Sequence, residues 1–487
     1  MPYSTLRLLV SKFTERIRHK IRKTRRQVRD GTSEDKSSGD KSTEKRSEAA
    51  SATIPALPPE ILCEIFLYCL PIDHDQCSIF KQSQAPSLLG RVCSRWRTVS
   101  ISSPHLWSRF AIVDRLNQTS GIDHKKAVEA TKLWISRSAS HPLSIFIHYP
   151  QYAPILQPVF ASILSESWRW KDINMVVSSE IGSLILATFR LAHLPHLENF
   201  RCAIFGEALR ERPLIYNFSS APRLQLFHHH RTPGVQIDFG SRVHHVKSLR
   251  IAYPPIARIP GTSFSDVLTC LTHCPLLEEF FFSVSESWTS RQEVPTVIEL
   301  LHLRVFILRL LPNINPGFLF DILFLPALIH VEIVNDVYED DRDWPHLRTM
   351  LARSRPPLQS LVLYSIPMNE QTLAECLSYT PSLALLSIPG TKCTDTTLDL
   401  LTVGGNDSFI SVCPCLETIR FGPGSQFSSS AMMAMILSRQ TSVDNPGIGD
   451  GKGLKSVFCT SRIVDNIAGN PDIARCMQNG LRLYTIR

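Results

Sequence analysis

The sequence predicts an α/β protein in which a small helical unit precedes a curved solenoid of stacked strand–turn–helix units. Three observations lead to this prediction. The pattern L-x-x-φ-x-φ, where φ is apolar, recurs ten times, usually after a proline or a similar breaker. Segments with apolar residues at helical spacing lie between several of these recurrences. A short apolar stretch at residues 54–110, too small to form a large core, stands ahead of them.

The recurrences define a repeat with an irregular period. Successive leading apolar residues are 22 to 38 residues apart, with a mean of about 29, at the upper edge of the period of leucine-rich repeats. A strand and helix repeated at this period cannot bury its apolar face alone, so neighbouring units must stack. The leading positions are Leu197, Leu224, Val246, Leu277, Leu303, Leu328, Leu358, Leu383, Leu416 and Leu454.

Helical patterns between the predicted strands support this stacking. They lie at residues 264–274, 370–380, 395–403 and 428–439. Any Leu-rich chain contains L-x-x-L-x-L by chance, but ten instances at a fairly steady period are hard to explain in that way. Regular leucine-rich repeats satisfy turn backbone groups with an Asn or Cys ladder, which is missing. We therefore expect an irregular horseshoe whose turns are satisfied otherwise.

Residues 111–190 predict a linking helix and entry repeats, ahead of the repeat solenoid at 191–487. The linking helix is expected at 124–138, and strands are expected at 143–149 and 172–177. The expected apolar stripe of the helix consists of Ala127, Ala130, Leu133 and Trp134.

The basic charge of the chain is confined to its first residues. Residues 1–30 contain ten Lys or Arg and two acids, whereas the remainder contains 42 basic and 42 acidic residues. We therefore expect no nucleic-acid-binding fold in the body. Residues 1–30 predict a basic amphipathic tail, for which nuclear import, anionic membrane contact, a mitochondrial presequence and a merely solvated tail stay open. Residues 31–53 are Ser-rich, charged and poor in large apolar side chains, which predicts a disordered linker.

Cysteine usage and hydropathy bear on the compartment. The 13 cysteines are odd in number and follow no framework spacing, which predicts reduced thiols in a cytoplasmic or nuclear protein. No apolar run approaches the roughly 20 residues that cross a bilayer, so we expect neither a transmembrane segment nor secretion.

Patterns for catalysis and metal binding are weak throughout. His228, His229 and His230, with His244 and His245, have no Cys or acid at ligand spacing, which favours a polar turn over a metal site. The chain contains no glycine-rich phosphate loop, no G-x-S-x-G elbow and no evident acid–base pair. We therefore expect no catalytic site, no cofactor and no metal.

The stretch at residues 54–110 predicts a unit of three short helices. Pro58 and Pro59 suit a helix start, because a first-turn proline loses no intrahelical hydrogen bond. Glu60 follows where the helix dipole favours an acid, and Leu70-Pro71 closes the helix ahead of a polar loop at residues 72–86. The first apolar stripe is Ile61, Leu62, Ile65, Phe66 and Cys69. The second is Leu88, Leu89, Val92, Cys93 and Trp96, and Pro104–Trp107 ends the unit.

The succession LPPEIL, IF, VCSRW and LW within this unit closely resembles an F-box, in the F-box-like form of mushroom-forming fungi. Irregular leucine-rich repeats are the usual companion of that module. The resemblance implies a small three-helix F-box followed by an irregular leucine-rich-repeat solenoid, a curved parallel sheet with outer helices. It implies the substrate-recognition subunit of a Skp–cullin–F-box ubiquitin ligase, in the Ubl conjugation pathway. The F-box would dock on the Skp adaptor, and the repeats would bind a target protein.

The resemblance also implies which residues face the Skp adaptor. Among them, Leu57 and Phe66 are the expected anchors, whereas Trp96, Trp107 and Cys93 are expected to pack inside the module. The insertion at residues 72–86 departs from the compact family pattern and is expected to weaken or reshape the contact. The expected adaptor-facing residues are Leu57, Pro58, Ile61, Ile65, Phe66, Leu70, Leu88, Leu89 and Val92.

A second candidate surface follows from strand alternation in the repeats. In L-x-x-φ-x-φ the φ residues point into the solenoid and alternate residues point to its concave face. An apolar patch rimmed by Arg and Glu on that face is typical of a protein-binding surface, unless loops or the C-terminal segment cover it. The expected target-binding residues are Phe281, Val305, Ile307, Arg309, Glu332, Val362, Tyr364 and Arg420.

Three functions remain open from sequence. The first is the non-enzymatic substrate receptor of a ubiquitin ligase. The second is a protein-binding scaffold that uses the repeats without assembling a ligase. The third is a hydrolase or transferase within residues 112–487, for which no residue constellation is found.

Overall fold

The structure is a computed structural model of the chain, and it divides into two compact units, Met1–Ile181 and Gly182–Arg487. The basic tail and the linker predicted for residues 1–53 lie outside the described residues. The described residues are 57–73, 77–113, 124–150, 157–206, 214–230, 235–252, 262–284, 297–311, 314–335, 343–366, 368–403, 412–444 and 453–486.

The first unit opens with the helical module. Its first helix, α2, spans Pro59–Tyr68, with Pro58 at the N-cap and Glu60 in the first turn, so the predicted helix start is confirmed. A 3₁₀ helix at Leu89–Arg91, the helix α3 at Ser94–Ile101 and a 3₁₀ helix at Pro104–Leu106 complete the module.

A small aromatic core holds the module together. Phe66 of α2 and Trp96 of α3 lie with ring centroids 4.8 Å apart, and both side chains are buried. Trp107 is also buried, and its Nε1 donates a hydrogen bond to the carbonyl oxygen of Ser100 at 2.7 Å. A buried indole needs such an acceptor. The predicted internal packing of Trp96 and Trp107 is therefore confirmed.

The second apolar stripe of the module is not one helix. The chain leaves the 3₁₀ helix at Val92, takes an extended conformation at Cys93 and then enters α3. Cys93 is the N-cap, and its Sγ accepts a hydrogen bond from the backbone N–H of Trp96 at 3.4 Å. Because an N-cap side chain turns back along the helix end, Cys93 is exposed. The expectation that Cys93 packs inside the module is wrong.

The insertion at residues 72–86 pairs with a sheet rather than forming only a polar loop. Cys77 and Ile79 are buried. The N–H of Ile79 donates to the carbonyl of Ala111 at 3.1 Å. The N–H of Ala111 donates to the carbonyl of Cys77 at 2.9 Å. Ala111 belongs to the first strand, β1, at Arg109–Val113. The insertion therefore satisfies backbone groups along the edge of this strand.

The rest of the first unit is a parallel strand–helix stack. β1 pairs with β2 at Leu143–Tyr149, which pairs with β3 at Trp170–Ser178, and both predicted strands are confirmed. Helices α4, His124–Arg137, and α5, Gln157–Leu164, connect them.

The buried stripe of α4 differs from the predicted one. Ala127 and Trp134 are buried as predicted, but Leu133 is 46% exposed and Thr131 is buried in its place. Thr131 lies four residues after Ala127 and three before Trp134, which is the helical spacing of one face. Its hydroxyl donates to the carbonyl of Ala127 at 2.9 Å. The Thr131 hydroxyl is already hydrogen-bonded within its own helix. This side chain can therefore be buried, although the helical period of apolar residues predicted Leu133 in the stripe.

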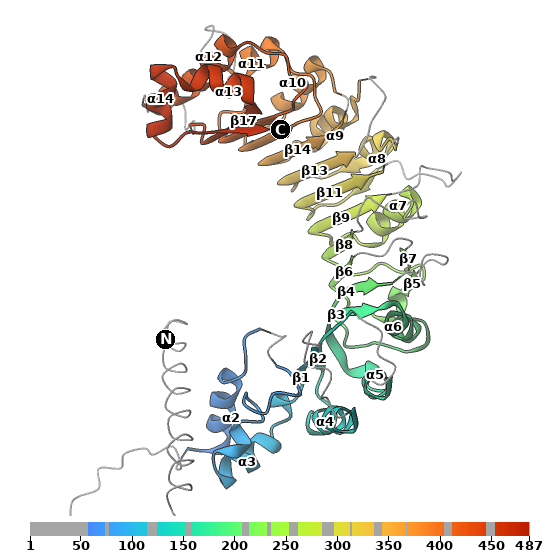
Figure 1. The fold of residues 1–487 in the computed structure, drawn as a ribbon. Helices are drawn as coiled ribbons and strands as arrows, with labels where there is room; N and C mark the ends of the chain where they lie inside the picture. The colour runs from blue at the N-terminus through green and yellow to red at the C-terminus, as the bar shows by residue number, and fades with distance from the viewer. Residues whose placement is uncertain are drawn as a thin grey trace, which may run out of the picture. The chain divides into compact units, whose positions relative to one another are not determined.

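The second unit is a ladder of parallel strands with helices along one side. The helix α6, Ser179–Leu191, crosses the boundary between the units. In Figure 1, the helices α7, α8 and α9 lie on the same, outer side of the curved ladder. In order across the sheet, the strands are β4 (Asn199–Phe205), β6 (Leu226–His230), β8 (Ser248–Ala252), β9 (Glu279–Val284), β11 (Val305–Leu310), β13 (His330–Asn335), β14 (Ser360–Tyr364), β15 (Leu385–Ile388), β16 (Thr418–Phe421), β17 (Ser456–Thr460) and β18 (Arg482–Ile486).

All ten predicted repeat strands are confirmed, and the α/β class with a large parallel sheet is confirmed with them. Each leading apolar residue is at most 2% exposed. Two short parallel pairs flank the ladder: β5 (Leu214–Asn217) with β7 (Val235–Asp238), and β10 (Ile298–Glu299) with β12 (Leu323–Phe324). The final strand, β18, was not predicted, although the buried Leu481 stands directly before it.

Eight helices of the second unit follow α6 in the part of the chain that the structure describes. The four predicted ones, α7, α10, α11 and α12, are confirmed within a few residues, whereas α8, α9, α13 and α14 were not predicted. Their bounds are α7 Phe264–His273, α8 Gly317–Ile322, α9 His346–Ser354, α10 Glu370–Ser378, α11 Asp395–Leu401, α12 Ser429–Asp444, α13 Ser461–Ala468 and α14 Pro471–Gln478. No described helix combines the length and the apolar character that a membrane span needs.

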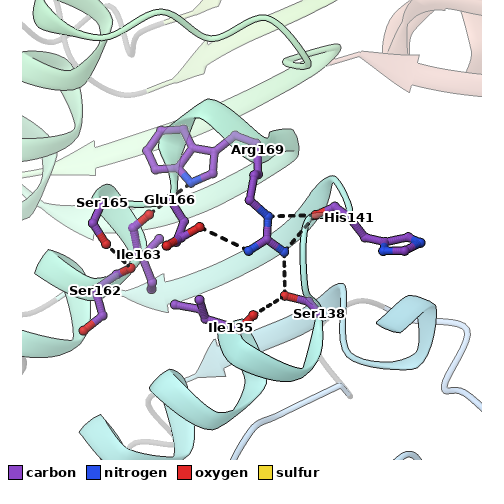
Figure 2. A network of polar contacts seen from close by, with 9 residues as sticks. Ile135, Ser138, His141, Ser162, Ile163, Ser165, Glu166 and Arg169 are labelled. Atoms are coloured by element: carbon purple, nitrogen blue, oxygen red, sulfur yellow. Dashed lines mark hydrogen bonds and ion pairs between the residues drawn. The ribbon is translucent and has the colours of Figure 1, made fainter. Parts of the chain in front are cut away.

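Arginines satisfy backbone carbonyl groups in the turns around several helix ends. In the first unit, Arg169 is buried and donates to the carbonyl of His141 through Nε at 3.0 Å and Nη2 at 2.9 Å. It also donates to Ser138, at the end of α4, and to the carboxylate of Glu166 (Figure 2). A buried carbonyl without a donor is costly, so this guanidinium offsets the desolvation cost of the carbonyl of His141 in the turn after α4.

The same device recurs twice in the second unit. Arg353 of α9 donates to carbonyl groups of Phe320, Asp321 and Leu323 around the end of α8. Arg439 of α12 is buried and donates to three carbonyls at and beyond the end of α11, those of Leu401, Val412 and Cys413. Side chains of a neighbouring helix therefore close these turns.

Carboxylates link the opposite helix ends. An acid near the start of one helix accepts hydrogen bonds from the start of the next, where backbone N–H groups are unpaired and the helix dipole favours negative charge. The bonds join Asn369 N to Asp343 at 2.9 Å, Thr394 N to Glu370 at 2.6 Å, and Ser428 N to Asp395 at 2.6 Å.

Candidate functional site

The helical module carries an exposed apolar surface on α2. Ile61 is 48% exposed and Tyr68 is 53% exposed, and Ile72, beyond the helix end, is 68% exposed. Leu62 and Phe66 occupy the opposite side of the helix and are fully buried. We define the α2 surface as the apolar residues Leu57, Pro58, Ile61, Ile65, Tyr68, Leu70 and Ile72, which are all half-buried or exposed.

The structure divides the residues that the resemblance implied for adaptor contact. Phe66 is 0% exposed and Leu89 is 3% exposed, so these two form the core of the module and do not line its surface. The choice of Phe66 as an anchor is therefore wrong for this conformation, because its ring packs on Trp96. Leu88 and Val92 are half-buried beside the 3₁₀ helix.

Tyr68 and Ile72 are surface residues that sequence reasoning missed. Tyr68 follows Ile61 by seven residues, which places it on the same helix face, so the helical period could have identified it. Ile72 lies in the segment that was interpreted as a polar loop. The Leu57 end of the surface is fixed by Arg95 of α3, whose guanidinium donates to the carbonyl of Leu57.

The strand register of the second unit brings the predicted target-binding residues onto one face of the sheet. Phe281, Ile307, Glu332 and Val362 stand opposite one another on β9, β11, β13 and β14. Ser387 and Arg420 continue the row on β15 and β16. We call the face that these residues share the sheet face. The expected juxtaposition of residues from separate repeats is thus observed.

The part of the sheet face on β8–β13 is electrostatically paired. Arg250 contacts Glu279 at 2.8 Å, and Glu332 lies 3.8 Å from Arg309 and 3.7 Å from His330. Burial raises the pKa of Glu279, but hydrogen bonds from Arg250 and Ser248 outweigh burial and lower it overall. The neighbouring imidazole of His330 lowers the pKa of Glu332. Both carboxylates are therefore charged and matched at neutral pH.

The part of the sheet face on β14–β18 combines an arginine with aromatic rings. Arg420 donates to the hydroxyl of Tyr364 at 3.1 Å, and its guanidinium carbon lies 4.7 Å from the centroid of Phe458. Phe458 in turn stacks on Tyr484, with centroids 4.4 Å apart and planes 12° from parallel. We call these four residues the arginine–aromatic cluster. Sequence reasoning included Arg420 and Tyr364 but missed Phe458 and Tyr484, the latter because β18 was not predicted.

The histidine triplet is part of strand β6 and not a turn, so that expectation is wrong. Alternation along the strand buries His229 and leaves His228 and His230 half-buried on the other side. His229 Nδ1 lies 3.1 Å from Cys202 Sγ and 3.0 Å from the Tyr216 hydroxyl. Burial raises the pKa of Cys202 to about 12 and raises that of Tyr216, so neither supplies an anionic nucleophile at neutral pH. This cluster satisfies polar groups in the core.

Other candidate ligands and thiols are also accounted for by packing. Among the described residues, no three His, Cys, Asp or Glu side chains are grouped so that they could hold a metal ion. Burial raises the pKa of Cys270 and raises that of Cys274 to about 12, which keeps both as thiols.

Comparison with known proteins gives no function for this chain, so the function has to be argued from these surfaces. No protein-family model and no curated protein matches this chain. Two features of the described residues therefore remain as candidates, the apolar α2 surface in the first unit and the sheet face in the second.

Proposed function

We propose that this chain is the substrate-recognition subunit of a Skp–cullin–F-box ubiquitin ligase. The observation that carries the proposal is the α2 surface. The module already has a complete core in Leu62, Phe66, Trp96 and Trp107, yet Ile61 and Tyr68 remain about half exposed. Apolar side chains left over after a core has formed are typical of a docking site. The resemblance of residues 54–110 to an F-box supplies the partner, the Skp-type adaptor and, through it, cullin.

The sheet face would bind the target protein. Its half-buried apolar residues, Ile307 and Val362 among them, lie beside charged residues on neighbouring strands. The chain would transfer no group itself. It would raise the effective concentration of the target near the ubiquitin-charged enzyme, which accelerates transfer without new chemistry.

Association with the Skp adaptor tests the proposal. Ile61→Asp and Tyr68→Asp each place a charge in the α2 surface, where desolvation of a carboxylate opposes docking. We expect either variant to lose adaptor co-purification. Leu133→Asp is the matched control, because Leu133 is 46% exposed on α4, close to the 48% of Ile61, and it should co-purify as the unchanged chain does. Adaptor retention by both α2 variants would refute the docking role.

One observation favours the alternative of a non-ligase scaffold. Burial of Phe66 and Leu89 leaves a smaller apolar contact than the resemblance implied. A weaker dock would let the chain bind proteins through the sheet face without assembling a ligase. The two functions differ in whether cullin accompanies the adaptor, and in whether a bound partner accumulates when the chain is removed from the cell.

A further inference from the structure

The sheet face of the second unit is asymmetric in charge. Strands β8–β13 carry two arginines and two glutamates, Arg250 with Glu279 and Arg309 with Glu332, and these contact one another. Strands β14–β18 contain Arg420 and Arg482 and no Asp or Glu. The first part is therefore neutralised within the fold, whereas the second part keeps its positive charge.

Arg420 is held in place by uncharged groups. One Nη donates to the hydroxyl of Tyr364, and the guanidinium group lies over the ring of Phe458. Phe458 in turn stacks on Tyr484 of the next strand. Arginine has five N–H donors in a planar fork that matches a carboxylate in two-point geometry. The cluster fixes the orientation of this fork before any ligand arrives, which reduces the ordering cost of binding.

The cluster also has the size of a short peptide site. β14 to β18 are successive neighbours in the sheet. At about 4.8 Å per strand spacing, they cover roughly 19 Å, the length of about six residues of extended chain. Arg482 lies on the same side of β18 as Tyr484, two residues away, and adds a second cation at the far end.

We propose that the arginine–aromatic cluster, together with Arg482, binds a short acidic segment of the target protein through its Asp or Glu carboxylates. The inference rests on the proposed role of the sheet face as the target-binding surface, and it adds the chemical class of the target. A carboxylate would accept hydrogen bonds from the N–H groups of Arg420 that bond to no described residue, and the rings of Tyr364 and Tyr484 would contact the neighbouring side chains. The positive charge of β14–β18 selects against basic segments.

Fluorescence anisotropy with the full chain tests this site. The probes are labelled hexaglutamate, labelled hexaglutamine and a labelled hexaglutamine that carries one phosphoserine. We expect hexaglutamate to bind at least about tenfold more tightly than hexaglutamine, and Arg420→Gln to weaken hexaglutamate about tenfold, the usual size of a charge-assisted bidentate pair. Arg420→Lys, which keeps the charge but not the planar fork, should fall between Arg420→Gln and the unchanged chain.

Arg348→Gln is the control for net charge. Arg348 lies on α9, where it pairs with Glu375 at 2.6 Å, so this variant makes the same change in charge away from the sheet face. It should change hexaglutamate affinity less than twofold, and circular dichroism should show all variants folded. Equal weakening by Arg420→Gln and Arg348→Gln, or no preference for hexaglutamate over hexaglutamine, overturns the inference. Tighter, Arg420-dependent binding of the phosphoserine peptide than of hexaglutamate overturns it in favour of phosphate.

These outcomes leave the proposed function separately testable. Adaptor docking depends on Ile61 and Tyr68 in the first unit, and none of the peptide probes uses that surface. If hexaglutamate shows no Arg420-dependent binding while adaptor association is intact, only the chemical class of the target is rejected. Loss of adaptor association in the unchanged chain would reject the ligase function itself.

Discussion

Three arginines in this chain have a structural role that the net charge of the sequence does not reveal. Arg169, Arg353 and Arg439 each donate hydrogen bonds to carbonyl groups at or near the end of a neighbouring helix. Each of these helix ends presents carbonyls that its own backbone cannot pair. A guanidinium suits the position because one side chain reaches several acceptors at once.

Arg439→Leu should destabilise the second unit strongly. The change removes three hydrogen bonds, of 2.7 to 3.0 Å, and leaves the carbonyls of Leu401, Val412 and Cys413 without these donors. We expect a loss of roughly 3 kcal/mol in the free energy of unfolding, measured by urea denaturation. Arg348→Leu, at a solvent-exposed ion pair, should change the free energy of unfolding far less than Arg439→Leu does. Equal losses for the two variants would contradict the structural role of Arg439.

Glu370 gives stability a dependence on pH. Burial raises the pKa of its carboxyl, but hydrogen bonds from Thr397 and Thr394 outweigh burial and hold the pKa below its ordinary value of 4.5. The unfolded chain therefore binds more protons, so this contribution is present above pH 4.5 and is lost as the pH falls through the folded pKa.

Glu370→Gln should flatten the decline of the unfolding free energy below pH 4.5. Urea denaturation at a series of acidic pH values measures that slope. Glu299→Gln, at an exposed position on β10, is the matched control for the loss of one carboxyl group. Identical slopes for the unchanged chain and for Glu370→Gln would show that this carboxylate does not couple the helix starts.

At the scale of elements, successive turns after β15 and β16 approach closely through glycines. A Cβ at Gly390 would overlap the backbone of Ser365, after β14, and a Cβ at Gly422 would overlap the carbonyl of Pro389, after β15. These backbone contacts set how tightly neighbouring repeats stack at the carboxyl ends of their strands.

Gly422→Ala should therefore destabilise the stack, whereas Gly424→Ala should not. Overpacking against rigid backbone typically costs about 1–3 kcal/mol, and we expect a loss of about 2 kcal/mol for Gly422→Ala. A Cβ at Gly424 meets no atom within 4 Å, so this variant is the matched control. Thermal or urea unfolding of both proteins decides the comparison, and equal stability would mean that the turns can separate without cost.

The helix α2 has separable faces for folding and for docking. Phe66→Ala removes a fully buried ring, so we expect it to destabilise the protein by about 3–5 kcal/mol. Any loss of adaptor binding by this variant would then reflect unfolding. Ile61→Asp changes an exposed residue and should leave the melting temperature within a few degrees of the unchanged chain. A melting temperature lowered equally by both changes would show that α2 lacks a free face.

At the scale of the whole molecule, the two proposed surfaces lie in different units and have different chemistry. The α2 surface is apolar, whereas the arginine–aromatic cluster carries positive charge. Hydrophobic docking is only weakly sensitive to salt, and binding of an acidic segment at exposed cations is screened by it.

Salt and point variants should therefore separate the two partners. Raising the ionic strength from about 0.05 to 0.5 M, which shortens the screening length several-fold, should weaken hexaglutamate binding while adaptor association changes little. In affinity purification, Ile61→Asp should lose ligase subunits and retain target proteins, and Arg420→Gln should do the reverse. Joint loss of both partner groups in either variant would contradict the independence of the surfaces.

Ten strands of the second unit follow from the sequence alone. When alternating apolar residues follow a leading leucine or valine, only one face of the strand can be buried. The position of Leu277 or Leu416 in the sequence therefore predicts where its strand lies. The same logic located α2, where the prolines and Glu60 mark the helix start. It failed where a polar residue satisfies itself locally, as Thr131 does, and at β18, where the preceding Leu481 was not recognised as a leading residue.

Only the tertiary structure decided which exposed side chains meet. Tyr364, Arg420, Phe458 and Tyr484 come from four strands that are far apart in sequence. They become neighbours because the strands stack in register, and local periodicity does not show which side chains reach across that register to touch. Burial of Phe66 was likewise decided by the ring of Trp96, brought close by α3. Local periodicity determines which side chains are buried, whereas contacts across repeats determine which side chains a surface presents to a partner.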